Sequence, residues 1–150
     1  MQHTLQFQSE LNANTDTAWR WITSFDGINT ELAPLLFMTA PSHVRTLTDV
    51  DVVYGEPLFR SWLKLFGLLP IDYSKLTLVE LEEGVGFTEC SRMGSMKVWQ
   101  HERKIVATPT GSRVTDTLTF ESYLPGFVVK PFVTTLFKHR HKKLQRHFNG

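Results

Sequence analysis

The feature that most constrains the fold of this chain is an alternation of residue types between positions 96 and 121. Two stretches place apolar or β-branched residues at every second position, and the turn-forming segment 108–112 (TPTGS) separates them. Period-two alternation around a Pro/Gly turn predicts two antiparallel strands joined as a long hairpin. The side rich in threonine is typical of a solvent face, so we expect the opposite side to point inward.

The predicted inward face of this hairpin carries charged side chains among large apolar ones. Placing the turn at the centre sets Arg103 opposite Asp116 and His101 opposite Leu118. This register keeps the apolar faces of both strands on the same side. Because buried charges are costly unless they are paired, the face either holds an ion pair or lines a cavity.

The preceding predicted strands add two carboxylates to this face. The turn at 94–95 brings Glu89 near Trp99 or His101, and Glu80 falls on the same side of the neighbouring strand. We therefore expect five ionisable residues to share one concave face: Glu80, Glu89, His101, Arg103 and Asp116.

The remaining patterns predict the order of elements along the chain. A strand over 3–12 precedes a helix that Asn14 or Thr15 caps. The other predicted elements are a short helix over 28–36, a loop over 37–56 with room for one or two short strands in 42–54, a helix over 57–67, a four-strand meander over 74–121 and a long amphipathic helix over 127–148. The helix over 57–67 would be apolar nearly all round, so it would either pack in the core or cover an opening.

Composition limits the classes of protein that this chain can belong to. With 150 residues we expect a single domain over 1–150. One cysteine excludes an intramolecular disulfide, and no metal-ligand or phosphate-loop spacing is present, so we expect neither metal nor cofactor. No apolar run is long enough to span a membrane and no secretory signal opens the chain, which makes a cytoplasmic location the expectation.

The net charge of +1 conceals a basic segment near the end of the sequence. Residues 138–147 hold five Lys and Arg residues and no acid. Cations suit the last turns of a helix, where they complement its dipole, and we favour this interpretation over a weak contact with an anionic membrane. We expect no nucleic-acid partner, because the segment lacks an aromatic stacking platform.

The order of elements and three short motifs resemble the helix-grip fold of the START-related superfamily, which includes polyketide cyclases, pollen-allergen-like proteins and lipid-transfer proteins. The motifs are NTDTAW at 14–19, WQHER at 99–103 and DTLTF at 116–120. The resemblance implies an α+β fold in which a curved antiparallel sheet wraps around the C-terminal helix, with two short helices after the first strand. Members usually have two more strands where this chain has its predicted loop and the helix over 57–67. The resemblance also implies a cavity between sheet and last helix for a hydrophobic or amphipathic small molecule, lipid-like or polyketide-like.

Three interpretations of the charged face follow. It is an ion-pair network without a ligand, as in an interaction module; it anchors the polar end of a ligand; or His101, with Glu89 or Asp116, acts as a general acid or base in a cyclisation or dehydration. We favour non-catalytic binding over an enzyme. The predicted ligand-binding residues are Leu78, Glu80, Phe87, Glu89, Trp99, His101, Arg103, Asp116, Phe120, Phe132 and Leu136.

Overall fold

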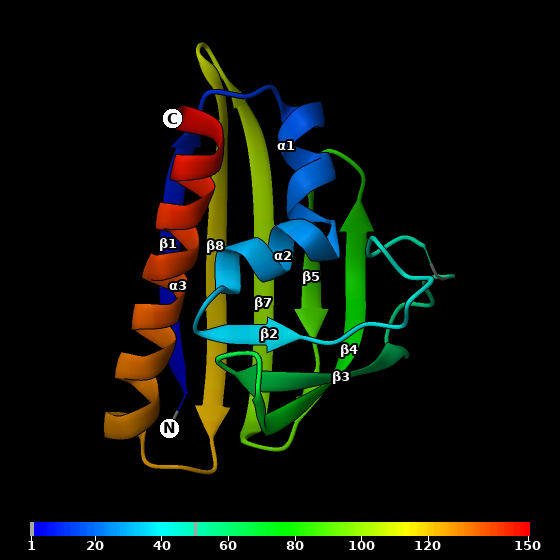
Figure 1. Cartoon of the computed structure of the whole chain (residues 1–150), viewed down its shortest axis with the longest axis vertical. Coiled ribbons are helices and arrows are strands. Elements are labelled where there is room, and N and C mark those ends of the chain that lie inside the picture. The colour runs from blue at the N-terminus through cyan, green and yellow to red at the C-terminus, as the bar shows by residue number, and fades with distance from the viewer. Residues whose placement is uncertain (1, 50) are drawn as a thin grey trace.

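A computed structural model describes residues 2–49 and 51–150, which form one curved antiparallel sheet with three helices (Figure 1). The strands are β1 (His3–Leu11), β2 (Leu36–Met38), β3 (Pro57–Leu65), β4 (Leu69–Glu82), β5 (Gly86–Cys90), β6 (Arg92–Met93), β7 (Met96–Thr108) and β8 (Gly111–Ser122), and the helices are α1 (Thr15–Ile22), α2 (Phe25–Leu32) and α3 (Gly126–Asn149). The predicted α+β helix-grip fold is therefore confirmed.

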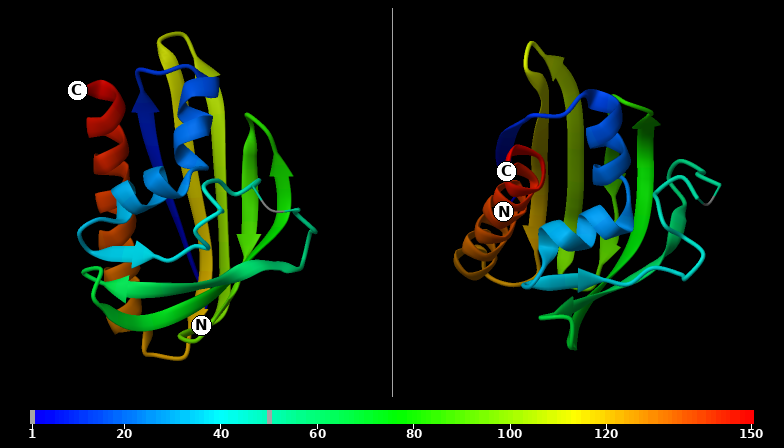
Figure 2. Two further views of the ribbon diagram at one scale, coloured as in Figure 1. Left: turned by 45° about the vertical axis from the view of Figure 1, so that its right-hand side comes forward. Right: turned by 45° about the horizontal axis from the view of Figure 1, so that its top comes forward.

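The sheet has the strand order β1-β8-β7-β5-β4-β3-β2, and β6 pairs with β4. Figure 2 shows how it curls around its concave side, where α1 and α2 lie across the sheet and α3 runs alongside β1. The long strand β4 pairs with β5 at one end and with β3 at the other, so β2 and β3 close the lower end of the concavity. None of the helices in the described part of the chain is long and apolar enough to cross a membrane.

The two short helices begin at side-chain caps. Asn14 accepts a hydrogen bond from the Thr17 backbone N–H at 2.8 Å, as its position before the first helix predicted. Ser24 caps α2 by accepting from the Gly27 N–H at 3.0 Å. α2 thus starts earlier than the predicted 28–36 and ends at Leu32, before Pro34. Gly27 is required here because a Cβ would lie 2.0 Å from the carbonyl oxygen of Trp21.

The predicted helix over 57–67 is wrong, because this segment forms strand β3. Arg60 and Trp62 point outward while Ser61 between them is buried, which is the period of a strand. The segment looked apolar all round since both of its faces carry large side chains. Strand pairing with β2 and β4 decided its conformation over helical spacing.

The prediction of short strands within 42–54 is also not met in the described residues of that stretch. An isolated bridge between Ser24 and Thr46 is the pairing that occurs there, and the additional strand β2 lies earlier, at Leu36–Met38. Position 50 lies outside the described residues.

The predicted meander and terminal helix are confirmed. β4, β5, β7 and β8 succeed one another as antiparallel neighbours, with Arg103 opposite Asp116 and His101 opposite Leu118. α3 extends over 24 residues and packs against β1 and α2. Its buried side chains, which include Val133, Phe137 and Leu144, fill the space between the helix and the sheet.

Candidate functional site

Strands β7, β8 and β5 bring four of the five predicted charged residues together on the concave face. Arg103 lies opposite Asp116, as predicted, and Glu89 lies opposite His101. All four side chains are buried. The inward side of the central hairpin therefore carries charges in the interior of the protein.

The Arg103 guanidinium joins two carboxylates. Its Nε and Nη2 donate to Asp116 at 2.7 and 2.8 Å, and its Nη1 and Nη2 donate to Glu31 of α2 at 3.0 and 2.8 Å. Burial opposes the charge of Arg103, but the charges of Asp116 and Glu31 outweigh it and raise the pKa of the guanidinium. Such bidentate pairing is the geometry in which a buried arginine is stable.

Helix α3 supplies two further residues. Arg140 Nε donates to Glu31 at 3.1 Å, and His141 Nε2 lies 2.7 Å from Asp116. The other ring nitrogen of His141 lies 2.6 Å from the Ser9 hydroxyl, which accepts from Gln145 at 3.1 Å. The basic segment 138–147 is therefore not simply a solvated helix end.

His101 stands between two carboxylates. Its Nε2 lies 2.6 Å from Asp116 and its Nδ1 lies 3.7 Å from Glu89, which also accepts a hydrogen bond from Ser91 at 2.6 Å. Burial lowers the pKa of His101, but the charge and hydrogen bond of Asp116, together with the nearby Glu89 carboxylate, raise it by more than burial lowers it, so the net direction is upward. Asp116 and Glu89 thus favour the protonated form of the imidazole.

Asp116 has no remaining capacity for a ligand. Its two oxygens accept from Arg103 twice, from His101 and from His141, which uses the four acceptor positions of a carboxylate. Burial raises its pKa, but Arg103 and His101 hold it well below its ordinary value. We therefore assign Asp116 a positioning role.

We call this group the polar cluster: Glu31, Glu89, His101, Arg103, Asp116, Arg140 and His141. Three carboxylates face two guanidinium groups and His101, so the charges balance when His101 is protonated. Charge balance with several hydrogen bonds per group is what makes a buried network tolerable.

A small cavity adjoins the polar cluster. It has a volume of about 40 Å³, enough for one or two water molecules. The cluster contributes Glu89, His101 and Arg140 to its wall, and the other lining residues are apolar: Phe25, Ile28, Met38, Leu47, Leu76, Leu78 and Phe87. The polar groups therefore share the wall of a chamber that is otherwise apolar, which we call the inner cavity.

The inner cavity lies under α2 and the segment that follows β2, rather than between the sheet and α3 as predicted. The space beside α3 is filled where Trp99 contacts Phe120 and Phe137 at ring-centroid distances of 6.1 and 6.3 Å. Of the α3 residues, Arg140 reaches the cavity wall.

An outer groove of about 720 Å³ lies next to the inner cavity. Its lining residues are Phe25, Asp26, Asn29, Thr30, Ala33, Phe37, Met38, Ala40, Pro41, Ser42, Val44 and Arg45. Phe25 and Met38 line both spaces, so these two side chains form the partition between the groove and the cavity.

The predicted ligand-binding residues are distributed unevenly. Leu78, Phe87, Glu89 and His101 line the inner cavity. Arg103, Asp116, Trp99, Phe120 and Leu136 lie in the cluster or in the packed core, away from its wall.

Two of these residues are not on the concave face. Glu80 is exposed because a register shift between Leu78 and Glu80 interrupts the alternation of β4. Phe132 is also exposed, since Val129, Val133 and Leu136 already form the buried stripe of α3.

Three cluster residues were missed in the sequence: Glu31, Arg140 and His141. Each stands at helical spacing from buried neighbours, Glu31 beside Ile28 and Leu32 of α2, for example. That spacing was the available signal, but charged residues within an apolar stripe have no visible partner in a sequence. Within residues 2–49 and 51–150, no three His, Cys, Asp or Glu side chains are arranged to hold a metal ion.

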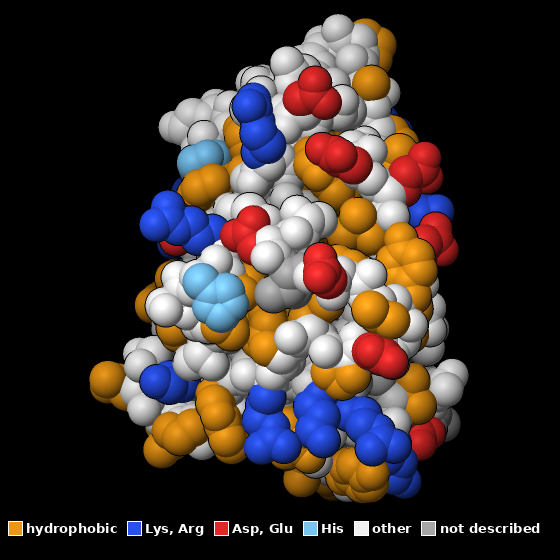
Figure 3. Space-filling model, turned by 90° about the vertical axis from the view of Figure 1, so that its right-hand side faces the viewer, with side chains coloured by type: hydrophobic (Ala, Val, Ile, Leu, Met, Phe, Trp, Pro, Cys, Tyr) orange, Lys and Arg blue, Asp and Glu red, His pale blue; other side chains and the backbone are white. Residues whose placement is uncertain are grey.

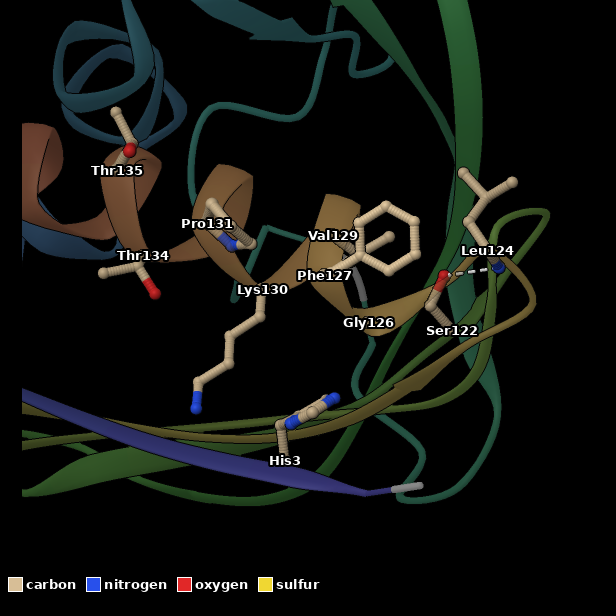
Figure 4. Close-up of a pocket in the computed structure, with 10 residues that line it drawn as sticks. All are labelled: His3, Ser122, Leu124, Gly126, Phe127, Val129, Lys130, Pro131, Thr134 and Thr135. Atoms are coloured by element: carbon tan, nitrogen blue, oxygen red, sulfur yellow. Dashed lines mark hydrogen bonds between the residues drawn. The ribbon is translucent and has the colours of Figure 1, made fainter.

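A larger pocket of about 770 Å³ lies away from the polar cluster, at the beginning of α3 (Figure 4). His3 of β1 and Lys130 of α3 face it, together with apolar residues such as Phe127 and Leu124. It is open to solvent and contains none of the cluster residues, so we place the candidate site at the inner cavity.

The chain matches the family described as Domain of unknown function (DUF8410) over residues 9–148. The protein belongs to the DUF8410 family. No curated protein matches the sequence.

Solved structures share the fold of this DUF8410 chain. Protein CV1439 from Chromobacterium violaceum is 12% identical with a TM-score of 0.72, and the match covers 94% of both chains. A START superfamily protein from Mycobacterium smegmatis is 12% identical with a TM-score of 0.64, covering 99% of this chain and 97% of that one. The AHSA1-like protein from Aeromonas hydrophila is 11% identical with a TM-score of 0.65, covering 97% and 94%. At these identities the likeness establishes the START-related helix-grip fold alone.

Proposed function

We propose that this protein binds a small hydrophobic molecule with a polar end, lipid-like or polyketide-like, in the inner cavity and does not transform it. The observation that carries the proposal is the composition of the cavity wall, which has seven apolar residues and three polar ones, Glu89, His101 and Arg140. Ligand sites are typically apolar with a few placed polar groups that fix orientation. We also propose a cytoplasmic location, as expected from the sequence.

At about 40 Å³ the inner cavity is too small for such a molecule, so binding requires the partition to open. Met38 is half-buried, flexible and shared with the outer groove, which makes it the side chain best suited to move. Opening between Phe25 and Met38 would join the two spaces and let a ligand enter from the groove.

Two buried hydroxyls on the same inner face support the proposal that a ligand binds in this region. Ser74 lies two residues before the cavity residue Leu76 on β4, and Ser61 is its cross-strand neighbour on β3. Neither hydroxyl has a hydrogen-bond partner among the described residues. Unpaired buried polar groups are costly, so a water molecule or a polar ligand group beside them would stabilise the protein.

A titration with the fluorescent probe 1-anilinonaphthalene-8-sulfonate (ANS) tests the proposal. Met38→Ala widens the partition and should tighten binding by about threefold or more, whereas Leu47→Phe fills the cavity and should weaken it by about tenfold. Met93→Ala is the matched control, because Met93 is also half-buried but lines neither space.

Two controls accompany this titration. Thermal unfolding of each variant verifies that the fold is intact. Leu68→Asp removes an exposed apolar group remote from the cavity and should leave ANS affinity unchanged. Equal affinity in the wild type and the Leu47→Phe variant would contradict the proposal.

One observation supports a catalytic alternative. His101 lines the cavity and its pKa is raised, which favours the protonated form, so with Glu89 it could donate a proton in a cyclisation or dehydration. Asp116 is a poor partner for that reaction because its acceptor positions are all occupied. Consumption of a bound molecule by the wild type but not by His101→Gln, with binding retained in both, would favour this alternative.

A further inference from the structure

One end of the molecule presents large apolar side chains to solvent. In the turn between β3 and β4, Phe66, Leu68 and Leu69 are 62%, 85% and 60% exposed. At the beginning of α3, Leu124 and Phe127 are 55% and 82% exposed. We call these five residues the apolar end; exposed groups of this size mark interaction sites more often than isolated ones do.

A groove connects the two parts of the apolar end. Its volume is about 400 Å³, and its wall includes Trp62 and Ile71 from the β3–β4 hairpin together with Tyr123 and Leu124 from the segment before α3. Every one of these four side chains is substantially exposed. The hairpin and the start of α3 therefore form one continuous surface.

The backbone holds the hairpin turn in place. The Phe66 N–H donates to the Leu35 carbonyl at 2.9 Å, which ties the turn to the segment before β2. Phe66 has a positive φ of 53°, a conformation rare for a bulky residue and found where structure or function requires it. Its apolar neighbours are thus fixed in an outward position.

Cations flank the apolar end on the outer face of the sheet. Arg60, Lys75 and Arg92 are cross-strand neighbours on β3, β4 and β6, and Lys64 lies further along β3. In the part of the chain that the structure describes, none of the four forms an ion pair. Like charges opposite one another are destabilising, so the row favours an anionic partner.

The space-filling view shows this arrangement. In Figure 3, Lys and Arg side chains stand next to one another along the lower part of the face, and hydrophobic side chains protrude beside and below them. The nearby acid Asp72 is engaged, because it accepts hydrogen bonds from the Ser95 hydroxyl and from the Tyr73 N–H.

Aromatic rings separate Arg60 and Lys75 from the apolar end, whereas Lys64 lies beyond the rings, next to the turn. Trp62 and Tyr73 pack edge to face at 6.1 Å, and the Arg60 guanidinium lies 5.2 Å from the centre of the Tyr73 ring. Toward the turn, the surface therefore changes from cations to amphipathic rings and then to protruding apolar groups. This order suits a lipid headgroup region above acyl chains.

We infer that this end of the protein docks on an anionic phospholipid membrane, with the β3–β4 turn inserted among the acyl chains and the cations at the headgroups. Side chains that project from a turn can enter a fluid bilayer directly, whereas a protein partner would need a matching recess. The C-terminal part of α3, where the sequence suggested membrane contact, offers a weaker surface. Its Arg140 is buried, and no large apolar side chain among the described residues 138–150 is substantially exposed.

Flotation with vesicles of phosphatidylcholine containing phosphatidylserine, at low and high salt, tests the inference. The full chain should bind these vesicles and not pure phosphatidylcholine, and salt should weaken binding. Arg60→Glu with Arg92→Glu should lower the partition coefficient at least about tenfold, since each cation near such a surface contributes about fivefold. Leu68→Asp, at an 85% exposed position that threatens no core contact, should reduce binding comparably.

The matched control is Lys138→Glu with Lys142→Glu, which makes the same charge change on exposed positions of α3. It should change the partition coefficient less than about twofold. Equal losses in the two double variants, no effect of Leu68→Asp, or no vesicle binding by the wild type would overturn the inference. So would a wild-type dimer that Leu68→Asp dissociates without any vesicle binding. None of these outcomes depends on ANS binding in the inner cavity, so this inference and the proposed function succeed or fail separately.

Discussion

Replacing Arg103 with methionine tests whether the polar cluster holds the fold together. Arg103 is fully buried and donates four hydrogen bonds, two to Asp116 and two to Glu31. Methionine keeps most of the apolar stem and removes the charge. The variant therefore measures the loss of the ion pairs with little loss of packing.

The expected cost follows from the bonds that remain. Removing one partner of a buried ion pair costs about 3 to 5 kcal/mol, because the other charge is left uncompensated. Asp116 keeps His101 and His141, and Glu31 keeps Arg140. We therefore expect the lower end of that range, about 3 kcal/mol, which in a chain of this length lowers Tm by roughly 6 to 12 °C.

Urea unfolding at pH 7, followed by circular dichroism, gives the free energy directly. The control is Arg113→Met, whose partner Glu10 is exposed, so its loss should cost less than about 1 kcal/mol. In the double variant Arg103→Met with Glu31→Gln the effects should be less than additive by about 1 kcal/mol, because the neutral amide relieves the stranded charge. If Arg103→Met costs no more than Arg113→Met, the cluster does not have the bonding described above.

Two further predictions concern the same charges. Glu31→Gln removes a negative charge that Arg103 and Arg140 share, and it should lower the free energy of unfolding in urea by about 2 kcal/mol. An unchanged free energy of unfolding would show that Glu31 is not part of the polar cluster. The stability of the wild type should also decrease at both low and high pH. The lowered pKa of Asp116 contributes stability above its ordinary value of 3.8, which is lost as the pH falls through the folded-state pKa. The raised pKa of His101 contributes stability below 6.5, which is lost as the pH rises through the folded-state pKa; a His101→Gln variant that keeps the same alkaline slope would contradict this assignment.

The sequence predicted the parts of the fold that depend on local alternation. The register of the β7–β8 hairpin followed from its turn and its apolar face, which correctly placed Arg103 opposite Asp116. The same reasoning failed at Glu80, because a single register shift moves a side chain to the other face and leaves no mark in the sequence.

Segments whose conformation depends on distant partners could not be predicted locally. Residues 57–65 satisfy helical spacing, but pairing with β2 and β4 makes them a strand. For the same reason, three residues of the polar cluster could not be identified from the sequence. Glu31 and Arg140 lie 109 positions apart, and only the fold shows that each neutralises the other beside Arg103.

The proposed function requires that the inner cavity, which Met38 and His101 both line, binds a ligand. The most direct measurement is a crystal structure of the protein grown with ANS. We expect ANS in a widened inner cavity, with Met38 displaced and the sulfonate near Glu89, His101 and Arg140. ANS bound only in the outer groove or at the apolar end, beside an unchanged inner cavity, would contradict the proposed function.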